Sequence, residues 1–256
     1  MSVFENYAQY YDLLYQDKDY EGESRFVHEL ISNYSPDART ILELGSGTGR
    51  HAEILARSGF QLCGVERSAE MLAHCMSRYD TLTPKLKDSL TFTHGDLRNC
   101  IIQRSFDAVI SLFHVISYQT SNNDLIAAFR TARKHLKSSG LFIFDVWYGP
   151  AVMYTPPSVR VKRLQSETHE LIRIAEPVQY CNENIVDVNY RLLLKEQSSL
   201  KTDSVTELHR MRYLFKPELE LLLNMTDFKL IDTCAWLTRE EISFNTWGAC
   251  FIAQSI

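Results

Sequence analysis

Three glycines at alternate positions follow an apolar segment near the start of the chain. The segment Ile41–Leu44 runs directly into Gly45, Ser46, Gly47, Thr48 and Gly49. Because glycine has no Cβ atom, such a loop lets a ligand approach the backbone closely. When the loop follows the first strand of a parallel α/β sheet, it lies at the edge where ligands bind. The spacing therefore predicts a ligand site built partly from backbone.

The glycine spacing also discriminates between ligands. A dinucleotide fingerprint reads G-x-G-x-x-G, and its third glycine would fall where Arg50 stands. A pyrophosphate resting on the helix N-terminus is therefore less favoured. Glu43 precedes the loop, and its carboxylate could receive the ammonium group of an amino acid ligand, directly or through water.

Two further carboxylates end the next two expected strands. Glu66 ends the second strand, where a carboxylate can accept hydrogen bonds from both ribose hydroxyls. Asp96 follows the third strand beside the same crevice and could accept the adenine amino group. Taken singly, a glycine turn, a solvated strand end or a turn cap explains each signal. Together, at the ends of consecutive strands, they indicate an S-adenosylmethionine pocket between about Thr40 and Asp96.

The segment Ser111–Tyr118 leaves the fourth expected strand, across from the glycine loop, and should face the transferred methyl group. His114 is a candidate proton acceptor because imidazole titrates near neutral pH. A packed or hydrogen-bonded histidine is an equally weighted alternative. Tyr118 could orient the acceptor or simply form part of the wall, and Trp147 after the fifth strand is a candidate lining residue. An amine must be neutral to attack, so a nearby proton acceptor helps, whereas an oxygen acceptor would need a stronger base or a metal.

The N-terminal segment is rich in tyrosine: Tyr7, Tyr10, Tyr11, Tyr15 and Tyr20. One interpretation is a helix that packs its amphipathic tyrosines on the core. The other is a lid whose rings cover a sulfonium, since aromatic faces attract cations. The two interpretations have equal weight. A basic cluster at Arg160, Lys162 and Arg163 likewise suits either a nucleotide diphosphate or a solvated strand face.

These segments resemble the class I S-adenosylmethionine-dependent methyltransferases. The matching segments are Glu43–Gly49, Gly64–Met71, Gly95–Leu97 and Phe106–Phe144. The flanking segments Tyr11–Gln16, Lys18–Tyr20 and Asp145–Trp147 look like bacterial N-methyltransferases that dimethylate amino groups of nucleotide-linked deoxysugars. Glycine and sarcosine N-methyltransferases are similar more loosely.

The resemblance implies roles for individual residues. Tyr11 and Tyr20 would close over the cofactor, and Tyr11, His114 and Tyr118 would be catalytic. The other implied cofactor contacts are Glu43, Gly45, Ser46, Gly47, Glu66, Arg67, Met71, Gly95, Asp96, Leu97 and Leu112. The acceptor side would comprise Tyr15, Phe113, His114, Tyr118 and Trp147. Tyr118 stands where the sugar enzymes carry a histidine, and Asp145 replaces their strand-end glutamate, so the acceptor stays open.

Short apolar strands alternate with amphipathic helices up to Val146, which predicts a parallel, doubly wound sheet. The expected strands are Thr40–Leu44, Gln61–Val65, Leu90–Thr93, Ala108–Leu112 and Leu141–Val146. The expected helices are Arg50–Ser58, Ala69–Tyr79 and Asp124–Leu136. Ser121 and Asn122 stand at N-cap positions of the last helix, and Gly140 reads as its stop signal.

The pattern changes after Val146. Glycines and prolines predict a loop over Trp147–Pro157. The expected strands after it are Val159–Leu164, Leu171–Ala175, Ile185–Leu194 and Val205–Phe215, and the alternation in the third predicts an antiparallel layer with one wet face. Pro217 begins a helix to Met225, and the strands Lys229–Ala235 and Trp247–Ala253 return to the main sheet. The expected fold is α/β, a Rossmann-like methyltransferase sheet with an inserted antiparallel layer. Its parts are an N-terminal helical lid at 1–39, the cofactor-binding domain at 40–149 and 216–256, and the insertion at 150–215.

Composition limits the other function classes. The 256 residues include 45% apolar and 23% charged residues, and the net charge of −5 argues against nucleic acid as the default partner. No apolar run approaches the roughly 18 residues of a membrane span, so no membrane is expected. The six cysteines show no zinc-ligand spacing, so no metal is expected. The N-terminus lacks the features of a secretory signal, which favours the cytoplasm.

The expected partner is a small-molecule acceptor, an amine such as an amino sugar nucleotide. In the resembled family the inserted layer covers the acceptor and helps form dimers, so a homodimer is a further expectation. Two other functions stay open on the sequence. One is a non-catalytic S-adenosylmethionine-binding protein, and the other, disfavoured by the glycine spacing, is a nicotinamide-dependent oxidoreductase.

Overall fold

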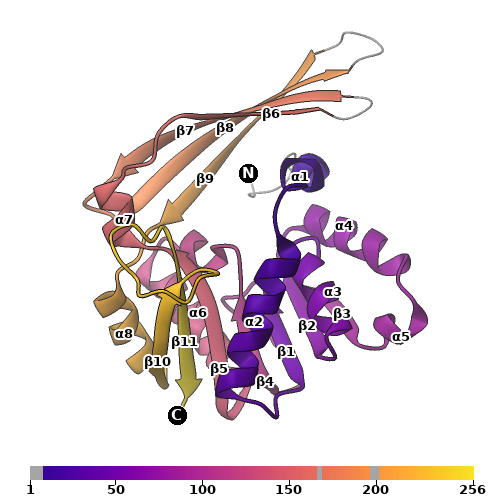
Figure 1. The fold of residues 1–256 in the computed structure, drawn as a ribbon, viewed down its shortest axis with the longest axis vertical. Helices are drawn as coiled ribbons and strands as arrows, with labels where there is room; N and C mark the ends of the chain where they lie inside the picture. Colours follow the sequence, from indigo (N-terminus) through magenta and orange to yellow (C-terminus); the bar gives the residue numbers. More distant parts are fainter. Residues whose placement is uncertain (1–7, 166–168, 197–201) are drawn as a thin grey trace.

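The computed structural model of the protein describes residues 8–165, 169–196 and 202–256, and it contains two β-sheets (Figure 1). The larger sheet has seven strands in the order β10-β11-β5-β4-β1-β2-β3. Its strands are β1 (Thr40–Leu44), β2 (Gln61–Glu66), β3 (Leu90–His94), β4 (Phe106–Ser111), β5 (Leu136–Trp147), β10 (Phe228–Ala235) and β11 (Gly248–Ser255). Strands β1 to β5 are parallel, and β11 runs antiparallel to both β5 and β10. The α/β fold and the return of the last two strands to the main sheet are confirmed.

Helices cover both faces of this sheet. One face packs on α2 (Tyr20–Tyr34) and α3 (Arg50–Arg57) through residues such as Ile41 and Ile143. The other face packs on α6 (Asn122–Lys134) and α8 (Lys216–Asn224) through residues such as Phe142 and Phe144. Neighbouring strand residues thus point to opposite cores, as buried strands require. Helices α4 (Ala69–Asp80) and α5 (Pro84–Lys87) lie near β3, at one end of the sheet.

Two local predictions were wrong. Gly140 does not end a helix, because α6 ends at Lys134 and Gly140 lies within β5. A Cβ atom there would meet the carbonyl oxygens of Lys137 and Asp107 at 3.0 and 3.1 Å, so close backbone approach explains this glycine. The expected loop after Trp147 contains the helix α7 (Gly149–Tyr154), with Pro150 in its first turn, where the missing N–H is harmless. The predicted N-cap at Ser121 is confirmed, since its Oγ accepts from the Asp124 N–H at 3.1 Å.

The smaller sheet rises beyond the carboxyl ends of the parallel strands (Figure 1). It contains β6 (Arg160–Gln165), β7 (His169–Tyr180), β8 (Ile185–Glu196) and β9 (Thr202–Arg212), all antiparallel. Val186, Val188 and Leu192 are buried on the face towards α1 (Ala8–Leu14), which confirms the predicted alternation. Asp187 is the exception on the opposite face, because Arg210 covers it. None of the described helices has the length and apolar character needed to span a bilayer.

Candidate active site

The glycine loop adopts a backbone conformation that residues with a Cβ atom rarely take. Gly45 and Gly49 have φ values of 82° and 76°, in the left-handed region. A Cβ atom on Gly45 would lie 2.6 Å from Val115 Cγ1, which shows that the short helix η1 (Val115–Tyr118) packs against the loop. The loop after β4 therefore lies beside the glycine loop, as the sequence predicted. On the other side, Met71 Cε lies close to Gly47.

Glu66 is fastened to the glycine loop. Its Oε2 accepts from the Gly47 N–H at 2.9 Å, and its Oε1 accepts from the Ser68 N–H at 2.7 Å. Each carboxylate oxygen can accept a second hydrogen bond, so both remain usable by a ligand. Burial raises the pKa of Glu66 even though these backbone donors favour its charged form.

Glu43 lies deeper, with 1% of its surface exposed. Burial, together with the charge of Glu66, raises the pKa of Glu43 to about 8. Within the described part of the chain, Glu43 Oε2 and Ser46 Oγ are buried without a hydrogen-bond partner. Buried polar atoms are normally paired, so these two point to a polar ligand group. An α-ammonium at Glu43 and a ribose at Glu66 fit these donors and acceptors, and S-adenosylmethionine carries both.

The adenine side contains an arginine that sequence reasoning missed. Asp96 Oδ1 accepts from the backbone N–H and the Nε of Arg98, both at 2.9 Å, and Arg98 also bonds Asp124 at 3.0 Å. Although burial alone would raise it, these contacts hold the pKa of Asp96 below its usual value. Asp96 is thus fixed as a carboxylate, with Arg67 Nη1 3.8 Å from its Oδ2. Its role as the adenine acceptor stays a prediction, as do the roles of the neighbouring residues Gly95 and Leu97.

On the acceptor side, His114 pairs with a buried carboxylate. Asp145, 1% exposed on β5, accepts from the His114 backbone N–H at 3.1 and 3.2 Å. The ring atom His114 Nδ1 lies 2.7 Å from Asp145 Oδ2. Both Phe113 and His114 have φ values near 60°, a strained conformation for such residues and one that clusters at functional sites. A strained loop thus holds an imidazole 2.7 Å from a carboxylate, and this imidazole remains 23% exposed.

Aromatic rings connect this pair to the N-terminal segment. Tyr11 and Tyr15 are 4.7 Å apart, and Tyr15 meets Phe113 edge to face at 5.1 Å. His114 in turn lies 6.2 Å from Trp147. The structure therefore connects Tyr11 and four of the five predicted acceptor residues, all but Tyr118, through ring contacts. Two predicted cofactor residues, Met71 and Leu112, are buried nearby in apolar clusters. Tyr7 lies outside the described residues.

A chain of ionisable groups links the N-terminal segment to Glu43. Lys18 pairs with Glu23, and its Nζ lies 4.1 Å from the Phe113 ring. His51 Nε2 lies 2.7 Å from Glu23, and His51 Nδ1 lies 3.8 Å from Glu43. Although burial opposes it, His51 and then Lys18 lower the pKa of Glu23 to about 2. Sequence reasoning missed this chain, since only the packing of α2 on α3 brings Glu23 to His51. Tyr20, another predicted lid residue, lies 5.0 Å from the His51 ring.

Tyr118 is placed differently from the other predicted acceptor residues. It ends η1, and its hydroxyl lies 2.7 Å from Nδ1 of His209 on β9. His209 Nε2 lies 3.1 Å from Glu207 Oε1 on the same strand. Neither His209 nor Glu207 carries a sequence signal, because their meeting with Tyr118 depends on how the second sheet docks.

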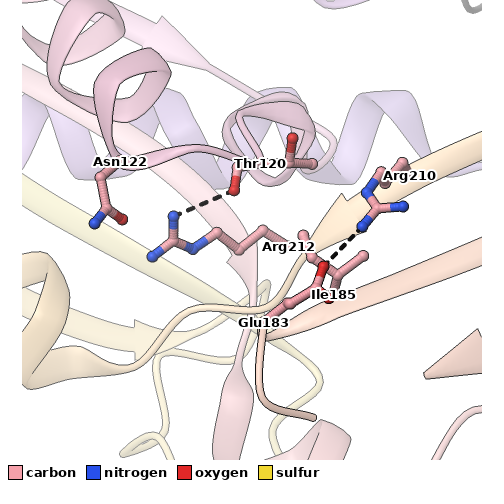
Figure 2. Close-up of a pocket in the computed structure, with 6 residues that line it drawn as sticks. All are labelled: Thr120, Asn122, Glu183, Ile185, Arg210 and Arg212. Carbon is pink, nitrogen blue, oxygen red and sulfur yellow. Dashed lines mark hydrogen bonds and ion pairs between the residues drawn. The ribbon is translucent and has the colours of Figure 1, made fainter. Parts of the chain in front are cut away.

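A polar cavity of about 350 Å³ lies where β9 meets the loop before α6 (Figure 2). Its lining residues are Thr120, Asn122, Glu183, Ile185, Arg210 and Arg212, all different from the predicted site residues. Arg210 pairs with Glu183 at 2.9 Å, and Arg212 pairs with Glu218. Glutamates therefore balance the charges of both arginines, and the cavity lies at the contact between the two sheets. Elsewhere in the described chain, no cluster of three or more His, Cys, Asp or Glu side chains could hold a metal ion.

Comparison with known proteins connects this geometry to a family. Residues 41–140 match the methyltransferase domain model. A dTDP-3-amino-3,4,6-trideoxy-alpha-D-glucopyranose N,N-dimethyltransferase of Streptomyces venezuelae is 27% identical over 72% of this chain and 75% of its own. A glycine/sarcosine N-methyltransferase of Aphanothece halophytica is 32% identical over 42% of this chain and 40% of its own.

Solved structures share the whole fold. DesVI of Streptomyces venezuelae matches with a TM-score of 0.81 at 22% identity, over 98% of both chains. The S-adenosylmethionine-bound CalS10, an amino pentose methyltransferase from Micromonospora echinaspora, matches with a TM-score of 0.77 at 20% identity, over 100% of this chain and 99% of its own. The chain is therefore an S-adenosylmethionine-dependent methyltransferase, with its methyltransferase domain at residues 41–140.

Proposed function

We propose that the enzyme methylates an amino group of a small molecule, and that this molecule is an amino sugar nucleotide. The observation that carries the proposal is the pair of His114 and Asp145 beside the glycine loop. An imidazole held by a carboxylate is a suitable proton acceptor for an amine near neutral pH.

Different residues of the site would contribute to different parts of an in-line displacement. S-adenosylmethionine, when bound, supplies a methyl group already activated by the sulfonium charge. Glu43 and Glu66 hold the cofactor in position, and the rings of Tyr11, Tyr15 and Phe113 exclude water from the reacting centre. His114 takes the proton that the amine must lose, and Asp145 keeps its ring oriented and stabilises the resulting charge.

Two observations support a nucleotide-linked acceptor. The relatives named above include a dimethyltransferase of a dTDP-linked amino sugar. In addition, the inner face of the second sheet carries Arg160, Lys162 and Arg173, according to the register of β6 and β7. These cations provide a positive field for a diphosphate. Arg163, the third member of the predicted basic cluster, lies on the opposite face.

Labelled methyl transfer tests this proposal. The wild-type enzyme should move the methyl group of S-adenosylmethionine to the amine of a dTDP-linked amino deoxysugar. His114→Ala should lower kcat about a hundredfold, the usual range for loss of a general base, with cofactor affinity retained. Asp145→Asn tests the orienting partner and should also lower kcat. Cofactor binding without turnover of any amine, or wild-type turnover by His114→Ala, would overturn the proposal.

We also propose the division into a lid, a cofactor-binding domain at 40–149 and 216–256, and an insertion at 150–215. The burial of Phe26 and Leu30 of α2 against the main sheet supports a lid shorter than residues 1–39, ending near Asp19. The homodimer is a further proposal, supported by exposed apolar side chains on the outer face of the second sheet, including Val161, Val178 and Leu208. The cytoplasmic location expected from the sequence stays a prediction.

A further inference from the structure

Two cysteines face each other on the last two strands of the larger sheet. Cys234 on β10 pairs directly with Cys250 on the antiparallel strand β11, so both side chains point to the same face of the sheet. Both are free thiols, 4% and 0% exposed. Opposite residues of an antiparallel pair have Cα atoms about 4.5–5.5 Å apart, and a disulfide spans about 4.4–6.8 Å between Cα atoms. The register therefore places the two side chains within reach of a disulfide.

The two thiols differ in acidity. A hydrogen bond donated by the Cys250 thiol lowers the pKa of Cys234, although burial opposes this effect. Burial, and then the hydrogen bond to Cys234, raises the pKa of Cys250 well above its usual value. The thiolate is the reactive form of cysteine, so Cys234 is the thiol that reacts first with an oxidant. Cys250 is then placed to react with the oxidised Cys234.

Cys234 is also the more accessible of the two thiols. β10 is an edge strand of the larger sheet, and Cys234 lies one residue before its carboxyl end at Ala235 (Figure 1). The ends of elements open locally at a lower free energy than the core of a domain. Such an opening admits a molecule as small as a hydroperoxide. Cys250 is shielded more strongly, because β11 lies between β10 and β5.

We propose that Cys234 and Cys250 are a modification site, at which a small hydroperoxide converts the two thiols into a reversible disulfide. The Cys234 sulfur attacks one oxygen of hydrogen peroxide, the O–O bond breaks, and a sulfenic acid and hydroxide form. The Cys250 sulfur then attacks the Cys234 sulfur, and the S–O bond breaks to release a second hydroxide. The two thiol protons convert both hydroxides to water. Two thiols are thus oxidised for each peroxide that is reduced.

The disulfide would form beside the proposed proton acceptor. Cys250 lies opposite Asp145 of β5 in the register of the sheet. Two residues before Cys250, a Cβ atom on Gly248 would lie 3.6 Å from His114 Cε1. A disulfide shortens the separation of opposite Cβ atoms from about 4.5–5.5 Å to about 3.8 Å, so the two strands draw together by roughly 1 Å.

A displacement of this size should reduce turnover, because reacting groups tolerate little misplacement. The expected loss of turnover rests on the proposed amine methylation by His114 and Asp145. Formation of the disulfide does not depend on that function. The two parts of the inference therefore have separate tests.

Peptide mapping tests the disulfide directly. Trypsin cuts after Arg239, which separates Cys234 from Cys250 into two peptides with one cysteine each. Folded protein that is treated with hydrogen peroxide and then alkylated should yield these two peptides as one linked species. Dithiothreitol should return both cysteines to thiols that can be alkylated. If the two peptides stay separate after treatment with peroxide, the inference is overturned.

Turnover tests the consequence of the disulfide. Peroxide should lower the kcat of the wild-type chain for a dTDP-linked amino deoxysugar by about tenfold, and dithiothreitol should restore it. Cys234→Ala and Cys250→Ala each remove one sulfur, so peroxide should not lower their turnover, and either variant suffices if the other does not fold. Cys181→Ala is the matched control, because it removes an exposed thiol of the second sheet. This control should lose turnover in peroxide as the wild type does.

The two measurements distinguish failure of this inference from failure of the proposed function. If the linked peptides form while the reduced enzyme methylates no amine, the proposed function fails and the disulfide site is supported. If the linked peptides form and turnover stays at the level of the reduced enzyme, the regulatory consequence is overturned. An equal loss of turnover in Cys234→Ala and the wild type would overturn it as well, since another residue would then be the target of the peroxide.

Discussion

Glu43 couples cofactor binding to pH. Its pKa of about 8 in the free protein results from burial and from the charge of Glu66. At pH 6.5 the carboxyl is therefore mostly protonated, although an arriving ammonium group needs it ionised. Binding should release close to one proton at this pH, and affinity should increase between pH 6 and 8. Calorimetry in buffers of different ionisation enthalpy measures the proton release, and Glu43→Gln should abolish it together with most of the affinity.

The same carboxyl should weaken the free protein at alkaline pH. A folded pKa above the usual value of 4.5 means that the folded state binds this proton more tightly than the unfolded state. Its contribution to stability is complete below pH 4.5 and is lost as the pH rises through 8. Glu43→Gln should therefore raise the Tm of the free protein near pH 8.5 by about 2–4 °C for each kcal/mol recovered. An unchanged Tm and unchanged proton release would show that Glu43 is ionised without the cofactor.

Residues at strand ends could be predicted from the sequence, whereas residues that meet across elements could not. Glu43 and Glu66 were identifiable because each stands at the carboxyl end of an apolar strand. His209 has no such context, since its contact with Tyr118 depends on the register of β9 and on the docking of the second sheet. The same holds for Asp145, whose pairing with His114 requires a left-handed turn after β4.

At the scale of elements, the segment from α1 to Asp19 lies between the two sheets. Lys162 on β6 donates to the Leu14 carbonyl at 2.9 Å and pairs with Asp17 at 2.6 Å. Arg173 on β7 donates to the Tyr15 hydroxyl at 3.5 Å. The second sheet therefore helps to hold this N-terminal segment, the proposed lid, in place.

Removal of the Lys162 contacts should loosen the proposed lid without disturbing the cofactor pocket. Lys162→Met keeps the aliphatic stem but removes the charge. Because the pair with Asp17 is largely exposed, cofactor affinity should weaken by about twofold to fivefold, with a smaller effect at high salt. Calorimetry at low and high ionic strength measures this. Arg163→Met is the control, because Arg163 directly follows Lys162 on β6 and lies on the opposite face. Equal losses in both variants would contradict the lid interpretation.

Element types were predictable where periodicity was strong, and they failed where proline and glycine were read as breaks. The five parallel strands and three intervening helices occur as expected. Pro150, by contrast, stands in the first turn of α7 rather than in a loop. Gly140 marks a close approach inside β5 rather than a helix end. Pro150 is compatible with the first turn of a helix, and Gly140 is compatible with the interior of a strand. Local sequence rules alone therefore assign both residues wrongly.

At the scale of the whole molecule, the outer face of the second sheet carries exposed apolar side chains among its polar ones. Val161 is 51% exposed and Leu208 47%, and Val178 lies on the same face between them. This face lies away from α1 and the active site (Figure 1). Exposed apolar side chains on a sheet face can pack on the same face of a second copy about a two-fold axis, which supports the proposed dimer.

Two charged residues on that face should prevent the proposed dimer from forming. Val178→Glu combined with Leu208→Glu places like charges opposite each other across the two-fold axis, and their desolvation opposes association. Light scattering should show the wild-type chain as a dimer and the variant as a monomer, with cofactor affinity within about twofold because the glycine loop is remote from this face. Leu221→Glu, an exposed apolar position on α8, is the matched control and should remain dimeric. If the wild-type chain is a monomer, the proposed dimer is refuted. If the double variant is still a dimer, the interface lies on another face of the protein.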